Sequence, residues 1–140
     1  MRKTKRTKRQ QTSREQFLEN ALCSDLSCLE AGLTITKRQE VIRYPGRDRD
    51  SNPGRIDILA KDKRGRIVVI ELKAGKAGRR AIGQILGYMG AIMAAKNEPV
   101  RGVLIAERFS PQGEAAARAV QTLKLIQIKN LHLKTIKKTI

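Results

Sequence analysis

The spacing of hydrophobic residues changes several times along the chain between the helical period and the alternation of a strand, and each change marks the start of a predicted element. After Ser13, a residue type that often caps a helix, apolar side chains recur at helical spacing, so a first helix is expected from about Arg14 into the twenties. These apolar positions are Phe17, Leu18, Ala21, Leu22, Leu26 and Leu29. Gly32 is expected to end this helix, and residues 33–45 then alternate in the manner of a strand.

Residues 55–60 and 66–72 are two short apolar runs on either side of the charged segment KDKRG. Gly65, within that segment, can take the positive φ that tight turns require. The two runs therefore predict an antiparallel β-hairpin. The segment before them, residues 46–54, is a loop by composition, because it is rich in Gly, Pro, Asn, Ser and mixed charges.

The second half of the chain alternates helices and strands. Apolar residues of 80–96 form one stripe on a helix, and residues 101–107 form an apolar strand. Ser110 followed by Pro111 is a typical helix start, and residues 123–129 predict a last strand. The resulting order, α, β, β, β, α, β, α, β, indicates an α/β fold with a central mixed β-sheet flanked by α-helices.

Positive charge is concentrated at the two ends of the chain. The 140 residues carry 30 Lys and Arg against 13 Asp and Glu, a formal net charge of +17. Residues 1–14 hold seven of the basic residues and 124–140 hold five, and neither segment contains an acid. We therefore divide the chain into a basic flexible arm, residues 1–13, a folded domain, residues 14–130, and a basic tail, residues 131–140.

This charge favours a polyanionic partner, since it adds salt-dependent affinity for nucleic acid. Aromatic residues make up only 3% of the chain, which favours contacts with the backbone of duplex or branched DNA over base stacking. The segment MRKTKRTKRQQT has no apolar stretch of the kind a secretory signal needs, and no run of about eighteen apolar residues follows. We expect a cytoplasmic, nucleoid-associated protein with no membrane partner and no small-molecule cofactor.

Two acids and a lysine interrupt the apolar runs of the predicted hairpin. In the expected register Asp57 comes beside Glu71, and Lys73 shares a strand face with Glu71. Paired carboxylates repel one another unless a cation joins them, and Mg²⁺ or Mn²⁺ prefers such carboxylates with a backbone carbonyl, for which Leu72 is placed. The alternative is that these side chains face solvent, but IVVIELK is typical of a strand buried on both faces.

The segment GRIDILAKDKRGRIVVIELK, followed by AIGQILGYMGAI, resembles the PD-(D/E)xK nuclease superfamily and, within it, the catalytic domain of the NucS/EndoMS endonucleases. The likeness covers roughly residues 15–130. It implies a restriction-endonuclease-like core and a Mg²⁺-dependent endodeoxyribonuclease. The resemblance makes Asp57 and Glu71 metal ligands and Lys73 the catalytic lysine.

Three further site residues rest on the same resemblance. Gln84 would reach the active site, and Tyr88, one helical turn later, would support it or touch DNA, with ordinary helix packing as the alternative. The family places a glutamate on the first helix, where Glu19 fits best and Glu15 is the alternative.

Basic residues beside the acids are candidates for contacts with DNA phosphates. Lys76, Arg79 and Arg80 lie in the glycine-containing segment KAGKAGRR just after Lys73. Weaker candidates lie in and after the loop at 46–54, namely Arg47, Arg49 and Arg55.

Three functions remain open on the sequence. The first is an endonuclease selective for mismatched, flap or branched DNA, and the second is a Holliday junction resolvase of the same superfamily. The third, from a different class, is a non-catalytic nucleic-acid-binding protein, against which the acids count because they repel phosphate. A homodimer is expected, since the glycine-lined apolar stretch 83–95 can serve an interface.

Overall fold

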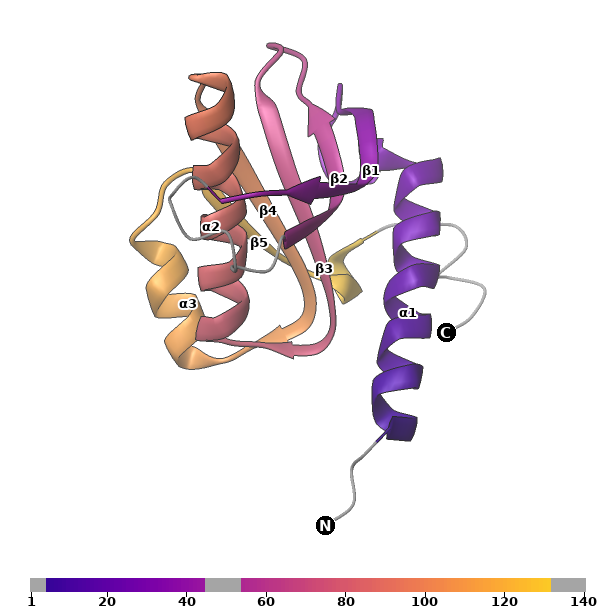
Figure 1. Cartoon of the computed structure of the whole chain (residues 1–140). Coiled ribbons are helices and arrows are strands. Elements are labelled where there is room, and N and C mark those ends of the chain that lie inside the picture. Colours follow the sequence, from indigo (N-terminus) through magenta and orange to yellow (C-terminus); the bar gives the residue numbers. More distant parts are fainter. Residues whose placement is uncertain (1–4, 45–53, 132–140) are drawn as a thin grey trace.

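A computed structural model describes residues 5–44 and 54–131. Its helices and strands follow one another in the predicted order (Figure 1). They are α1 (Lys5–Ser24), β1 (Thr34–Ile42), β2 (Gly54–Lys61), β3 (Ile67–Ala77), α2 (Arg79–Lys96), β4 (Val100–Phe109), α3 (Pro111–Arg118) and β5 (Leu123–Gln127). Within these residues, no helix has both the length and the apolar character that crossing a membrane requires.

The strands form one mixed sheet in the order β1-β2-β3-β4-β5. The pairs β1–β2 and β2–β3 are antiparallel, whereas β3–β4 and β4–β5 are parallel. The predicted hairpin is confirmed as β2 and β3, joined by a turn in which Gly65 has φ +79°. Helix α2 connects β3 to β4, and α3 connects β4 to β5, because the chain must cross back over the sheet before it can add a parallel strand.

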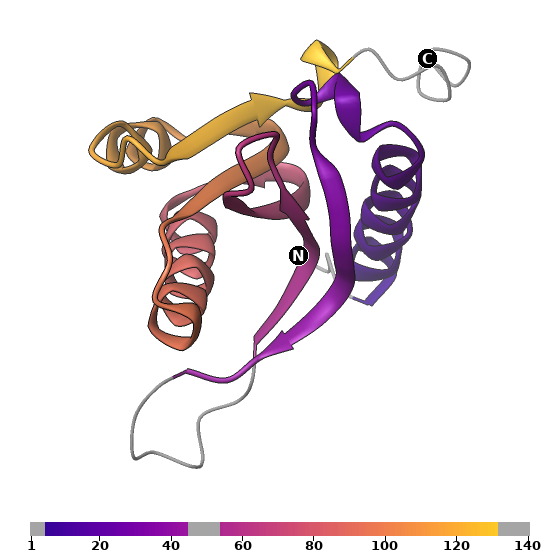
Figure 2. The same cartoon turned by 90° about the horizontal axis from the view of Figure 1, so that it is seen from above.

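Helices cover both faces of the sheet, with α1 on one side and α2 and α3 on the other (Figure 2). Alternate residues of the central strand β3 therefore enter two different hydrophobic clusters. Val68, Ile70 and Leu72 pack in the cluster that contains the α1 residues, whereas Ile67 and Val69 pack with α2. Burial on both faces explains why this strand is a continuous apolar run in the sequence.

The first helix differs from its prediction at both ends. It begins at Lys5 instead of about Arg14, so residues 5–13 of the predicted flexible arm are helical. Residues 5–12 contain no Gly or Pro and are rich in Lys, Arg and Gln, which favour helices, so Ser13 lies within the helix. The helix ends at Ser24, and Gly32, with φ +86°, lies in the turn before β1.

Two other boundaries also differ. Strand β3 continues to Ala77 past its predicted end at Leu72, with a shift in its register against β4 after Lys73. Leu131, predicted to begin the basic tail, is an apolar residue buried in the cluster beside α1, so the folded domain includes it. The rest of that tail and most of the predicted loop at 46–54, with Arg47 and Arg49, lie outside the described residues.

Candidate active site

The acids of the hairpin lie where β2 and β3 separate. The ladder between the strands runs from Lys61 opposite Ile67 to Ile58 opposite Ile70. At the next position the Asp57 N–H donates to Glu71 Oε1 at 2.9 Å, and the Leu72 N–H donates to Asp57 Oδ2 at 2.9 Å. Each carboxylate thus replaces a backbone acceptor on the opposite strand. The predicted proximity of Asp57 and Glu71 is confirmed.

Glu71 is buried and Asp57 is half-buried, and Lys73 offsets their negative charge only in part. Glu71 is 3% exposed, and burial together with the negative charge of Asp57 raises its pKa to about 8. Burial also raises the pKa of Asp57; the Leu72 N–H opposes that rise, and the negative charge of Glu19 adds to it. Lys73 lowers both pKa values without offsetting burial. A bound cation would relieve this repulsion.

The donor set fits a hard divalent cation, since Asp57 and Glu71 supply carboxylate oxygens from adjacent strands. Among the residues that the structure describes, no group of three or more His, Cys, Asp or Glu is arranged to hold a metal ion. A cation at this point would therefore depend on the two acids with backbone or solvent oxygens. The Leu72 carbonyl remains the predicted backbone ligand.

A bulge in β3 follows Lys73. Lys73 is in register with Ala106 of β4, but the next matched pair is Lys76 with Arg108, and Gly75 in between has φ +89°. Bulges of this kind redirect side chains next to functional sites. The Ala74 N–H in the bulge donates to Glu15 Oε1 at 3.0 Å, which connects α1 to the end of β3.

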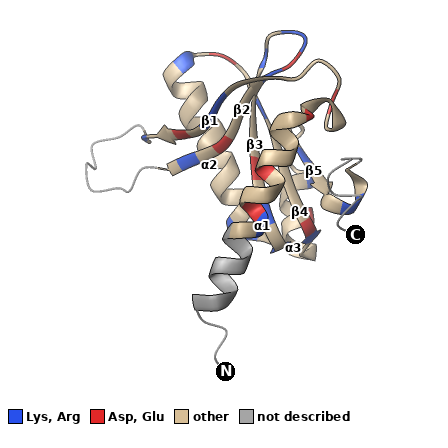
Figure 3. Ribbon diagram, turned by 90° about the vertical axis from the view of Figure 1, so that its right-hand side faces the viewer, with Lys and Arg blue, Asp and Glu red and all other residues tan. Residues whose placement is uncertain are grey.

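Helix α1 brings further acids to the same region. Figure 3, with α1 toward the viewer, shows acidic positions of this helix in front of the strands. Glu19 is 3% exposed, and Glu15, one turn earlier, is half-buried. The negative charges of both raise the pKa of Asp57, after the larger effect of burial. Glu19 remains the predicted first-helix glutamate, and its connection to Asp57 through Gln39 favours it over Glu15.

Two residues of β1 that the sequence did not single out hold Glu19. Arg38 donates to Glu19 Oε2 from Nε at 3.1 Å and from Nη2 at 2.7 Å, and Gln39 Nε2 donates to Glu19 Oε1. Gln39 Nε2 also lies 3.4 Å from Asp57 Oδ1. These contacts depend on how β1 approaches α1, so no local sequence pattern indicates them.

Tyr88 lies in the wall of the site. It is 5% exposed, stacks on Tyr44 with ring centroids 6.4 Å apart, and lies so close to Gly54 that a Cβ there would clash with its ring. Burial raises the pKa of its phenol, with a smaller contribution from the charge of Glu71. This packing favours the supporting role over a DNA contact. Gln84, one turn earlier on α2, is half-buried, and its catalytic role remains a prediction.

The predicted phosphate-binding residues are accessible. Lys76 on β3, Arg79 and Arg80 at the start of α2, and Arg55 on β2 are all exposed. Arg79 and Arg80 occupy the first turn of α2, whose N-terminal N–H groups add positive potential. Arg55 precedes Asp57 by two residues on β2, and Lys76 follows Glu71 by five residues on β3. None of the ion pairs found among the described residues joins these four basic side chains to Asp57 or Glu71.

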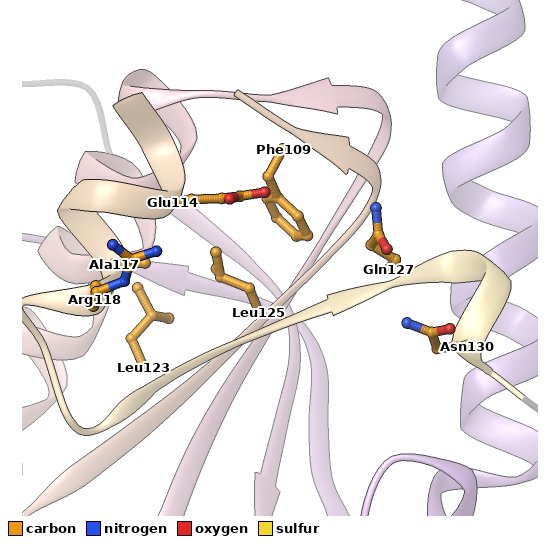
Figure 4. Close-up of a pocket in the computed structure, with 8 residues that line it drawn as sticks. All are labelled: Phe109, Glu114, Ala117, Arg118, Leu123, Leu125, Gln127 and Asn130. Carbon is orange, nitrogen blue, oxygen red and sulfur yellow. The ribbon is translucent and has the colours of Figure 1, made fainter. Parts of the chain in front are cut away.

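A separate cavity of about 430 Å³ opens between α3 and β5 (Figure 4). It is lined by Phe109, Glu114, Ala117, Arg118, Leu123, Leu125, Gln127 and Asn130. None of these is a candidate site residue. Gln127 is in register with Ala106, and Ala106 with Lys73, so the cavity lies two strands across the sheet from the lysine.

Comparison with known proteins gives one family and several relatives. The family described as Endonuclease NucS C-terminal domain matches residues 15–139. Endonuclease NucS of Pyrococcus furiosus is 33% identical over 114 residues, which are 81% of this chain and 38% of that protein. Endonuclease NucS of Pyrococcus abyssi is 32% identical over 95 residues, 68% of this chain and 34% of that protein. The chain spans about a third of the length of these curated relatives.

Solved structures confirm the predicted α/β fold. The crystal structure of a repair endonuclease from Pyrococcus abyssi matches with a TM-score of 0.68 and 26% identity, over 79% of this chain and 45% of that one. The structure of a complex of EndoMS with dsDNA matches with a TM-score of 0.66 and 21% identity, over 79% of this chain and 43% of that one.

Proposed function

Because the chain belongs to the family of endonuclease NucS C-terminal domains, we propose that it hydrolyses phosphodiester bonds of DNA with the help of a divalent cation. One observation carries this proposal, which is the reciprocal pairing of Asp57 and Glu71 at the opening of the hairpin. Burial of Glu71 beside the negative charge of the half-buried Asp57, which raises the pKa of Glu71, costs stability, and that cost is explained if the two acids bind a cation.

The residues around the acids have complementary roles in this proposal. Asp57 and Glu71 would hold Mg²⁺ or Mn²⁺, with the Leu72 carbonyl as a third protein ligand. When bound, the ion would act as a Lewis acid on the scissile phosphate. Lys73, on the strand face of Glu71, would orient the attacking water or stabilise negative charge on the phosphate. Gln84 and Glu19 would fix the geometry of this group from the two flanking helices.

DNA is the proposed substrate, and the exposed basic residues beside the site support it. Lys76, Arg79, Arg80 and Arg55 would contact the phosphates that flank the cut, which positions a strand without reading its bases. A structure of the relative EndoMS contains dsDNA. We propose selectivity for mismatched, flap or branched DNA, and such a substrate implies an intracellular, nucleoid-associated location.

A homodimer remains part of the proposal. On α2, Gly83, Gly90 and Met93 are exposed, and Met93 is 46% exposed although it belongs to the predicted apolar stripe. An added Cβ at Gly83 or Gly90 would meet no atom within 4 Å, so these glycines do not serve close packing on the sheet of the same chain. The mass in solution, by light scattering, tests the homodimer directly.

Two alternatives have distinct expectations. A Holliday junction resolvase would use the same acids and prefer a four-way junction over other DNA. A non-catalytic binder would gain nothing from placing Asp57 beside the buried Glu71, because acids repel phosphate.

Cleavage of a set of labelled DNAs tests the proposal. Linear duplex, mismatched duplex, flap, single strand and four-way junction are each incubated with the protein in Mg²⁺, Mn²⁺ or EDTA. We expect metal-dependent cleavage that Asp57→Ala abolishes and that Glu98→Gln, at an exposed acid, leaves unchanged. The preferred DNA separates a mismatch or flap enzyme from a resolvase. Salt-sensitive binding of these DNAs without any cleavage would support the binder instead.

A further inference from the structure

The backbone of Gln39 has a conformation that a strand residue rarely adopts. Its φ is +51°, in the left-handed region, although it lies within β1. Its neighbours are paired normally, with Arg38 opposite Ile58 and Glu40 opposite Ile56, which places Gln39 across from Asp57. Left-handed non-glycine residues persist where the surrounding structure requires them and are concentrated at functional sites.

The side chain of Gln39 connects two acids that come from different elements. Its Nε2 donates to Glu19 Oε1 on α1 and lies 3.4 Å from Asp57 Oδ1 on β2. A carboxamide nitrogen has two N–H groups, so one donor is available for each carboxylate. Asp57 Oδ2 is taken by the Leu72 N–H, and Glu19 Oε2 is taken by Arg38. Gln39 therefore holds the remaining oxygen of both acids.

We propose that Gln39 is a positioning residue of the metal site, which holds Glu19 at a fixed distance from Asp57. This inference rests on the proposed function, since it assigns Asp57 to a divalent cation. Glu19 and Asp57 repel each other as carboxylates, and Gln39 offsets that repulsion with two hydrogen bonds and no charge of its own. A lysine at this position would neutralise the acids, and a glutamate would add a third negative charge.

The unusual backbone makes it possible to test the side chain alone. Glycine and asparagine both accept a positive φ, so Gln39→Gly and Gln39→Asn keep the conformation of β1. Glycine removes the amide, and asparagine is one methylene too short to keep both contacts. Gln121→Gly, at an exposed turn residue between α3 and β5, is the matched control.

The experiment measures Mn²⁺ binding to the full chain by calorimetry in the absence of DNA, and thermal unfolding without metal. We expect the Mn²⁺ affinity to fall about tenfold in Gln39→Gly and Gln39→Asn, as for other residues that orient metal ligands, with the unfolding midpoint close to that of the parent. Gln121→Gly should bind Mn²⁺ as the parent does.

A second readout separates positioning from a general structural effect. With the preferred DNA, kcat should fall about tenfold in Gln39→Gly while KM for DNA stays constant, because the metal centre is affected and the phosphate contacts are not. Glu19→Gln in the Gln39→Gly background should add little further loss, since the two residues act through one contact.

Parent-like Mn²⁺ affinity in both Gln39 variants would overturn the inference, as would a parent protein that binds no Mn²⁺. If the variants lose Mn²⁺ affinity while the parent cleaves none of the DNAs, the positioning role holds and the proposed function fails. If the parent cleaves DNA and both variants bind and cleave equally well, the positioning role alone fails.

Discussion

The β2–β3 hairpin has a buried acid at each end, and the pKa values of these two acids are shifted in opposite directions. At the turn, Asp62 is 5% exposed and its pKa is about 2, because hydrogen bonds to the carboxylate outweigh the effect of burial. At the open end, Glu71 is 3% exposed and its pKa is about 8, because burial and the charge of Asp57 act together. Burial is nearly equal, so the partners make the difference.

Asp62 has a complete set of donors. Its Oδ1 accepts the N–H groups of Arg64 and Arg66 at 2.9 Å each, and its Oδ2 accepts Arg66 Nε at 2.8 Å and Arg101 Nη1 at 3.0 Å. Arg101 in turn pairs with Glu30. This acid therefore closes the turn and connects it to β4, which is a structural role.

Asp57 and Glu71 have one backbone donor each, and their nearest charges are mostly negative. Such acids destabilise the fold unless something binds them. The contrast with Asp62 shows that burial alone does not identify a functional acid in this chain. A deficit of positive partners distinguishes Asp57 and Glu71 from Asp62, and it supports the metal site proposed for them at the hairpin end that carries Lys73.

The largest effect is expected from a substitution at the open end of the hairpin. Glu71→Gln should reduce metal-dependent cleavage at least about a thousandfold, because it removes a proposed metal ligand, while DNA binding persists or tightens. Cleavage and a binding titration on the same DNA measure both quantities. A variant that cleaves within tenfold of the parent would contradict the role of Glu71.

The next largest effect is expected from a substitution at the turn end of the hairpin. Asp62→Ala should lower the free energy of unfolding by about 3 kcal/mol, because it leaves Arg101 and two backbone N–H groups without their acceptor. Denaturant unfolding measures the loss, and cleavage by the folded protein should remain near that of the parent. Unchanged stability would show that the network around Asp62 is not structural.

The pH dependence of stability should have opposite signs at the two ends. The folded-state pKa of Glu71, about 8, exceeds its ordinary value of 4.5, so the folded state binds this proton more tightly. In EDTA, the parent should therefore lose about 3 kcal/mol relative to Glu71→Gln as pH rises from about 5 to about 8. Asp62 should stabilise the fold above about pH 4 and lose that effect toward pH 2. Denaturant unfolding across pH measures both, and equal slopes for parent and variant would contradict the first.

The smallest effect lies at the edge of the turn network. Glu30→Gln should cost about 0.5 kcal/mol, because Glu30 is half-buried and Arg101 keeps its bond to Asp62. Chemical denaturation of Glu30→Gln and Asp62→Ala, each against the parent, measures the two losses in the free energy of unfolding. A loss as large as that of Asp62→Ala would place the centre of the network on Arg101 and Glu30.

The sequence predicted the contacts of the acids at the open end of the hairpin better than those at the turn. Alternation, the KDKRG turn and a strand apolar on both faces were enough to bring Asp57 beside Glu71. The same KDKRG segment contains Asp62, but its partner Arg101 is 39 residues away on β4. A local pattern carries no signal for a contact between strands so far apart in sequence.

Gln39 and the start of α1 were missed for different reasons. The contacts of Gln39 depend on a positive φ at a residue type that rarely adopts one, and on the approach of β1 to α1. The extra turns of α1 follow from helix propensity in residues 5–12, where charge suggested a flexible arm. In this segment helix propensity decides the backbone conformation, and the high positive charge does not prevent the helix.

Thermal unfolding with increasing Mn²⁺, compared between the parent and Glu71→Gln, tests most directly whether Asp57 and Glu71 form a metal centre. A cation that binds only the folded state raises its unfolding midpoint, independently of any DNA substrate. The midpoint of the parent should rise with Mn²⁺, and that of Glu71→Gln should stay constant. An equal rise in both proteins, or none in either, would contradict the assignment of Asp57 and Glu71 to a metal centre.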